Sequence, residues 1–150
     1  MTDQPCHVVY LSLGANIGQR RRTLRRAIRE IADRIGPVVR QSAFHETEPW
    51  GFSSQHAFIN AAVCVHTSLS PEELLCETQR IERLLGRTPD TKRAAHTEGA
   101  VVYHDRVIDI DILLYDDLTV RTPQLTIPHP LMRERDFVMQ PLSEILPEKQ

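Results

Sequence analysis

The sequence predicts a single α+β domain in which two helices cover one face of a four-stranded, mostly antiparallel sheet, with a helical appendage at the C-terminus. Three observations lead to this ferredoxin-like arrangement. Stretches with a two-residue apolar period and stretches with a helical period follow one another in the order β, α, β, β, α, β. The 150 residues are enough for one core and require no second domain. Two helices packed on one face are then the economical way to cover a split β-α-β sheet.

The composition excludes several functional classes. An apolar content of 41% with 25% charged residues is typical of a globular protein rather than of a disordered chain. The net charge of −2 provides no overall basic field for binding nucleic acid or an anionic membrane. No apolar stretch is long enough to span a bilayer. Cys6, Cys64 and Cys76 lack a C-x-x-C spacing and favour a reducing compartment, so we expect a cytoplasmic protein without membrane or nucleic-acid partners.

The N-terminal part predicts one strand and one helix. Residues 8–13 form an apolar run that ends in a glycine-bearing turn at 14–18, which predicts a buried strand. Apolar residues at helical spacing predict a helix over 23–35, stopped by Gly36-Pro37. We interpret the arginines around this helix as a solvated face; an RNA-binding face is the alternative, which the negative net charge disfavours. These arginines are Arg20, Arg21, Arg22, Arg25, Arg26 and Arg29.

The middle of the chain predicts two more strands separated by a loop. Weak alternation predicts a strand over 38–44, and proline and glycine predict a loop over 45–54, which carries the only tryptophan, Trp50. The next strand, 57–67, places Phe58 and Asn60 on one face. There they could stack on and pair with a heterocycle, or serve only packing and backbone hydrogen bonding.

A second helix and a long polar stretch follow. Ser70, with proline after it and Glu73 three residues on, predicts the start of a helix that runs to Gly86. Residues 87–100 are polar and lack a regular pattern. Long internal loops of this kind are lids or binding loops, or else disordered segments.

The strand at 106–115 is the stretch around which we expect the functional site. Strict alternation places its isoleucines on one face and Asp109 and Asp111 on the other. Residues i and i+2 on a strand lie about 6.5–7 Å apart at Cα, so both carboxylates can reach one divalent cation, or a pair of cations bridged by a phosphate. The alternative is a half-exposed edge strand whose acids simply face water.

The remaining sequence adds basic side chains that we expect near this acid pair. It has no glycine-rich phosphate loop or dinucleotide fingerprint, so side chains must hold any nucleotide. Prolines between 123 and 130 predict a rigid turn, and 132–146 reads as a partly helical tail interrupted by Pro141. Mg²⁺ at the acids, opposite arginine forks, is one way to stabilise phosphoryl transfer. The basic candidates are Arg87, Arg106, His129, Arg133 and Arg135.

Several segments together resemble the 6-hydroxymethyl-7,8-dihydropterin pyrophosphokinase family of folate biosynthesis. They follow one another over nearly the whole chain, and the combination of R-V-I-D-I-D-I-L with I-P-H-P and R-D-F is the most specific part. The segments are residues 12–18, 46–51, 58–61, 79–82 with 86–87, 106–113, 127–130 and 135–137.

The resemblance implies transfer of pyrophosphate from ATP to the hydroxymethyl oxygen of the pterin, with release of AMP. It implies that Asp109 and Asp111 hold two Mg²⁺ ions and that Arg87 and Arg106 contact the phosphates. The implied nucleotide site consists of Gln79, Glu82, Ile112, Thr126, His129 and Arg135, with Tyr103 as an aromatic contact. The implied pterin pocket consists of Thr47, Trp50, Phe58, Asn60 and Phe137. Phe58 and Phe137 would sandwich the ring while Asn60 reads its amide edge.

The chain departs from the family pattern in the loop 88–105. Pro89 stands where the family usually has another arginine, and the loop is several residues longer before Arg106. Lys92 and Arg93 have no assigned role, and no residue is assigned as general base. We expect a monomer that binds only its two small-molecule substrates. A ferredoxin-like module that binds nucleotide or pterin without turnover is the alternative function.

Overall fold

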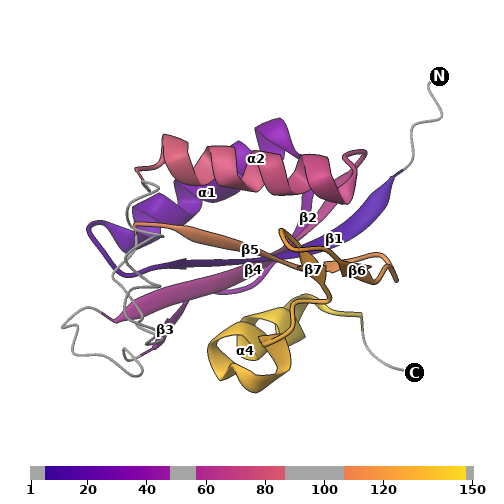
Figure 1. The fold of residues 1–150 in the computed structure, drawn as a ribbon. Coiled ribbons are helices and arrows are strands. Elements are labelled where there is room, and N and C mark those ends of the chain that lie inside the picture. The colour runs from indigo at the N-terminus through magenta and orange to yellow at the C-terminus, as the bar shows by residue number, and fades with distance from the viewer. Residues whose placement is uncertain (1–5, 48–56, 87–106, 148–150) are drawn as a thin grey trace.

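The fold is a layered α+β structure, seen in a computed structural model that describes residues 6–47, 57–86 and 107–147. In chain order the elements are β1 (His7–Ala15), α1 (Arg20–Arg34), β2 (Val38–Gln41), β3 (His45–Thr47), β4 (Phe58–Thr67), α2 (Pro71–Leu84), β5 (Asp109–Tyr115), β6 (Val120–Arg121), β7 (Thr126–Ile127), the 3-10 helix η2 (Met132–Glu134) and α4 (Asp136–Ile145). Helices α1 and α2 lie together on one face of the sheet, and α4 lies on the other (Figure 1). This confirms the predicted ferredoxin-like arrangement with its C-terminal appendage.

The sheet has the strand order β2-β4-β1-β5, with every neighbouring pair antiparallel. Each helix therefore connects two parallel strands that have one antiparallel strand between them, which is the split β-α-β topology. The predicted loop over 45–54 is wrong at its start, because residues 45–47 form β3 and pair with β4. Three residues without apolar alternation carry no local strand signal; only the partner strand defines them. The acidic strand β5 is an edge strand among the described strands.

Two hydrophobic cores lie on the two faces of the sheet. The larger core, between the sheet and α1 and α2, contains Ile59 and Val63 of β4. The smaller core, between the sheet and α4, contains Ala62 and Cys64 of the same strand. Because both faces of β4 are buried, the strand is apolar along most of its length rather than alternating with polar residues. The predicted separation of Phe58 and Asn60 from Ile59 and Val63 follows this alternation.

Strand β5 changes its facing part-way along, at a β-bulge. Leu11 pairs with Ile112 but Tyr10 pairs with Leu114, so Leu113 has no partner residue in β1. Up to Ile112 the even-numbered residues face the larger core, whereas beyond the bulge Leu114 packs against the smaller core and Tyr115 belongs to the larger one. The carbonyl of Leu113 accepts a hydrogen bond from the amide of His129 at 3.0 Å. The bulge therefore ties the proline-rich turn to the acidic strand.

The helix boundaries follow local chemistry with two differences from the prediction. Helix α2 begins with a capping box, in which the Ser70 hydroxyl accepts from the Glu73 amide and the Glu73 carboxylate accepts from the Ser70 amide. Helix α1 begins at Arg20, three residues earlier than the apolar pattern indicates. Helix α4 continues through Pro141 instead of being interrupted. Proline there removes one backbone hydrogen bond, and burial of its ring in the packed face of α4 offsets that loss.

The arginines of α1 divide into two groups. Arg21, Arg22, Arg25, Arg26 and Arg29 are exposed, as predicted for a solvated face. Arg20 is half-buried instead. Its guanidinium donates to the Ala57 carbonyl at 2.6 Å and lies 3.5 Å from the Glu46 carboxylate. It thereby joins the start of α1 to the β3 and β4 region. In the part of the chain that the structure describes, no helix combines the length and apolarity that crossing a bilayer requires.

Among the glycines that the structure describes, Gly36 is expected to be the least tolerant of substitution. A Cβ there would lie 1.9 Å from the backbone oxygen of His66, with φ at +157°, whereas a Cβ at Gly18, with φ at +70°, would meet nothing within 4 Å. Gly36→Ala should lower the free energy of unfolding by about 3–5 kcal/mol, since strain and a forced backbone shift add together. Gly18→Ala should cost only about 1–2 kcal/mol. Urea unfolding of both variants is the measurement, and equal losses would contradict the prediction.

Candidate active site

Asp109 and Asp111 lie on the same face of β5, as the alternation predicts. Both side chains are half-buried, whereas Ile110 and Ile112 between and after them are only 5% and 4% exposed. The isoleucines pack into the larger core, so the two carboxylates face the side of the sheet that carries α4. The alternative of an edge strand is therefore correct for the position of β5. Its acids, however, are half-buried rather than fully open to water.

A row of paired residues crosses the sheet from the acids to β3. Asp109 pairs with Gly14, Gly14 pairs with Asn60, and Asn60 pairs with His45. A Cβ at Gly14 would lie 2.8 Å from the Asn60 side-chain oxygen, so the glycine makes room for the carboxamide to lie over β1. The register thus brings an amide side chain to the same face as the acids.

Asn60 is held in place before any ligand binds. Its side chain is 4% exposed, and Nδ2 donates to Thr47 Oγ1 at 3.3 Å. Thr47 pairs directly with Phe58 across the β3 and β4 ladder. Three of the residues predicted for the pterin pocket therefore come together on one short hairpin. Gly14, which allows this arrangement, was not among the predicted site residues; a glycine inside an apolar strand was the available signal.

His129, in the proline-rich turn, interacts electrostatically with Arg135 at the start of α4 and with Asp109 of β5. Burial and then the charge of Arg135 lower the pKa of His129 below its ordinary value of 6.5, while Asp109 acts in the opposite direction. The His129 imidazole is therefore uncharged at neutral pH. Its Nδ1 accepts from the Leu131 amide at 3.2 Å, which leaves Nε2–H as a donor. An uncharged donor of this kind suits a phosphate oxygen.

Phe137 supplies an aromatic surface next to these groups. It follows Arg135 by two residues, and the Arg135 guanidinium lies 5.7 Å from the centre of its ring. Phe137 is half-buried at the border of the smaller core. Phe58, also half-buried, lies on β4 on the sheet face that α4 covers. Of the two predicted stacking residues, one thus comes from the sheet and the other from the helix that covers this face of it.

Two of the residues predicted for the nucleotide, Glu82 and Ile112, lie at the outer edge of β5. Glu82 of α2 is 4% exposed, and its carboxylate accepts from the Ile110 amide at 2.8 Å. Because backbone groups alternate along an antiparallel strand, those of Ile112 also point away from β1. The Ile112 side chain is buried, so a ligand would contact its backbone. Gln79 is half-buried on α2, and Thr126 is exposed on β7.

Several predicted site residues lie outside the described ranges. They are Trp50, Arg87, Tyr103 and Arg106; Lys92 and Arg93, which have no assigned role, also lie outside these ranges. The residues that flank segment 87–106 are described: a Cβ at Gly86 would lie 3.8 Å from the Val107 side chain. Gly86, after α2, and Val107, before the acidic strand, therefore lie close together.

The donor set suits a cation that is shared with a ligand. Within residues 6–47, 57–86 and 107–147, no three His, Cys, Asp or Glu side chains are grouped closely enough to form a metal cluster. Two neighbouring carboxylates are nevertheless what Mg²⁺ commonly takes from a protein when substrate phosphates and water complete its coordination. The residues present therefore fit Mg²⁺ of this kind rather than an enclosed structural metal.

Comparison with known proteins identifies the family. The model of the family described as 7,8-dihydro-6-hydroxymethylpterin-pyrophosphokinase (HPPK) matches residues 10–147. The chain belongs to this family. A relative from Porphyromonas gingivalis, named 2-amino-4-hydroxy-6-hydroxymethyldihydropteridine pyrophosphokinase, is 48% identical over 93% of this chain and 91% of its own length. One of the same name from Bacillus subtilis is 41% identical over 93% of this chain and 78% of its own length.

Longer proteins contain a matching region. The folic acid synthesis protein fol1 of Pneumocystis carinii is 39% identical over 91% of this chain but only 17% of its own length. Among solved structures, Plasmodium falciparum HPPK-DHPS matches 99% of this chain with a TM-score of 0.73 at 17% identity. This chain spans 42% of that structure. At this identity, the structural match supports the fold.

The lowered pKa of His129 generates a pH prediction. Since the folded state binds this proton less readily than the unfolded state, protonation favours unfolding. The free energy of unfolding should therefore decrease as pH falls from about 6.5 towards the lower folded-state pKa. A His129→Gln variant should lose this part of the pH dependence. NMR titration of His129 in Mg²⁺-free protein tests the cause, and a midpoint at or above 6.5 would contradict it.

Proposed function

We propose that this chain transfers pyrophosphate from ATP to the hydroxymethyl oxygen of 6-hydroxymethyl-7,8-dihydropterin, releasing AMP, in folate biosynthesis. The observation that carries the proposal is the row Asp109, Gly14, Asn60, which joins the acid pair and the amide on one face of the sheet. The acid proposed for the phosphates and the amide proposed for the heterocycle thus lie on the same face of the sheet, on either side of β1. Membership of the pyrophosphokinase family over residues 10–147 supports the same reaction.

The reaction consists of one displacement at phosphorus. The hydroxymethyl oxygen forms a bond to the β-phosphorus of ATP, and the bond from that phosphorus to the oxygen bridging the α and β positions breaks. That oxygen leaves with AMP, and the hydroxyl proton is lost to a base that we do not assign. No residue of the protein forms a covalent bond, so catalysis consists of positioning and charge stabilisation.

We propose that Asp109 and Asp111 hold two Mg²⁺ ions, which when bound would offset charge on the phosphates. Arg135 and the His129 Nε2–H would face the triphosphate, together with Arg87 and Arg106. For the remainder of the nucleotide, the outer edge of β5 is the proposed site, with Tyr103 as a further contact. The edge residues are Gln79, Glu82, Ile112 and Thr126.

The proposed pterin site is a stack with a polar edge. Phe58 and Phe137 would sandwich the flat ring, and the Asn60 carboxamide would pair with its amide edge beside Thr47. Because Asn60 is already buried and hydrogen-bonded, little ordering is needed on binding. Trp50 is proposed to cover this pocket.

We also propose that the chain forms a single domain and works in the cytoplasm as a monomer with no nucleic-acid or membrane partner. Light scattering of the purified protein, with and without ATP and pterin, tests the oligomeric state. A stable dimer would overturn that part of the proposal. A dimer could still catalyse the proposed reaction, so the oligomeric state and the activity are tested separately.

The direct test measures AMP released from MgATP in the presence of the reduced pterin. Pterin-dependent AMP supports the enzyme. Tight binding of both ligands with no AMP would indicate instead a non-catalytic binding module and would overturn the proposal.

Substitutions should separate the two parts of the site. Asp109→Asn and Asp111→Ala should each lower kcat by about 10²–10³-fold, because they remove groups that stabilise charge in the transition state. Phe137→Ala should mainly raise KM for the pterin, by about tenfold for the lost stacking. Asp117→Asn, at an exposed acid in the turn after β5, is the matched control and should leave both constants unchanged. A similar effect of all three site variants on substrate affinity alone would refute the assigned roles.

A further inference from the structure

The ladder between β4 and its outer partner is interrupted between β2 and β3. Gln41 pairs with Val63 and His45 pairs with Asn60, so three residues on one side oppose two on the other. The Ser42 hydroxyl fills part of the gap: it accepts from the Ala62 amide at 2.9 Å and donates to the Ala43 carbonyl at 2.8 Å. The Ala43 amide is thereby left without a partner in β4 and needs an acceptor from elsewhere.

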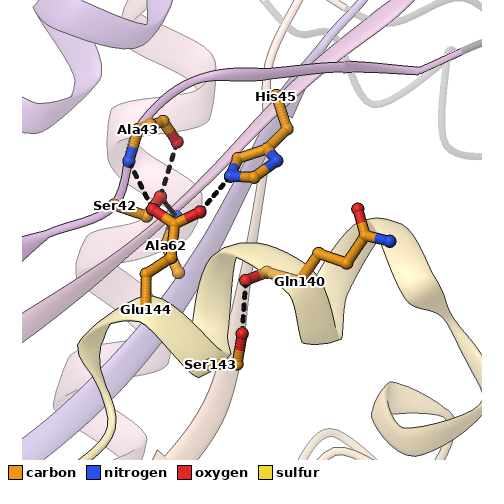
Figure 2. Close-up of polar contacts among 7 residues, drawn as sticks. All are labelled: Ser42, Ala43, His45, Ala62, Gln140, Ser143 and Glu144. Atoms are coloured by element: carbon orange, nitrogen blue, oxygen red, sulfur yellow. Dashed lines mark hydrogen bonds and ion pairs between the residues drawn. The ribbon is translucent and has the colours of Figure 1, made fainter.

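Glu144 of α4 provides that acceptor. One of its carboxylate oxygens accepts from the Ala43 amide at 2.9 Å, and the other contacts His45 Nε2 (Figure 2). The hydrogen bond from Ala43, and secondarily the contact with His45, lower the pKa of Glu144, so the carboxylate is charged at neutral pH. A second contact joins the same parts, since the Arg40 guanidinium donates to the Ile145 carbonyl at 3.4 Å.

These contacts connect the two sides of the proposed pterin pocket. Phe137 and Glu144 are seven residues apart on α4, which places them on one stripe of the helix about 10 Å apart along its axis. His45 pairs with Asn60, and Thr47 is two residues further along β3. The carboxylate thus joins the helix that carries the stacking ring to the hairpin that carries the polar edge.

We propose that Glu144 and His45 are positioning residues for the pterin, holding Phe137 at its working distance from Asn60 and Thr47. The inference rests on the proposed function. Neither residue was among the predicted site residues, because Glu144 and His45 are far apart in the sequence and only the folded chain brings them together. A purely structural anchor for α4 is the competing explanation.

The experiment compares Glu144→Ala, His45→Ala and the double variant by steady-state AMP release. Each single variant should raise KM for the pterin about tenfold, the worth of one charge-assisted hydrogen bond, with kcat and KM for ATP changed less than about twofold. The double variant should be no worse than Glu144→Ala alone, because that substitution already removes the contact with His45. Ser143→Ala, whose exposed hydroxyl only donates to the Gln140 carbonyl of the same helix, is the control and should match the wild type.

Glu144→Gln keeps the inference testable if Glu144→Ala fails to fold. Its amide oxygen can still accept from Ala43, so the unfolding midpoint should stay near that of the wild type while KM for the pterin rises as in His45→Ala. An unchanged KM for the pterin, or equal changes in both KM values and kcat, would overturn the inference. Failure of the proposed function would differ, since the wild type itself would release no pterin-dependent AMP, and the inference would then fall with it.

Discussion

The site depends on the register that places Gly14 between Asp109 and Asn60. Two antiparallel ladders, one on each side of β1, define this row. Because side chains alternate along a strand, a slip of one residue in β5 would turn both carboxylates into the larger core and its isoleucines outward. The cost of burying those charges therefore maintains the register. Glycine at the centre of the row is needed because the Asn60 carboxamide occupies the space that a side chain would fill.

Much of the fold follows from local patterns in the sequence. The alternation around Asp109 and Asp111 predicts their shared face, and the capping residues predict the start of α2 at Pro71. Strand β3 and the bulge at Leu113 carry no such local signal, because partner strands define both. The link between Glu144 and His45 escapes prediction for the same reason. Alternation predicts which side chains of a strand share a face, but not which strands lie next to it. The edge position of β5 is therefore seen only in the structure.

A protein with a net charge of −2 must build its proposed anion site locally. Among the described residues, the proposed site combines the cationic Arg135 with an imidazole that burial keeps uncharged. The charge of Asp109 acts to raise the pKa of His129, so the acid and the histidine interact electrostatically. The proposed phosphate region therefore contains both an acid, which attracts cations, and a cationic side chain, which attracts anions. We therefore expect this region to favour ligands that are negatively charged and carry bound cations.

Glu82 and His129 have a consequence for behaviour at high protein concentration. An unprotected outermost strand offers a row of amide and carbonyl groups on which a second molecule can assemble an intermolecular sheet. Here the Ile110 amide is occupied by a carboxylate from α2, and the Leu113 carbonyl by the amide of the proline-rich turn. The border of the sheet beside Asp109 and Asp111 can thus stay accessible to a small ligand while offering a poor template for self-association.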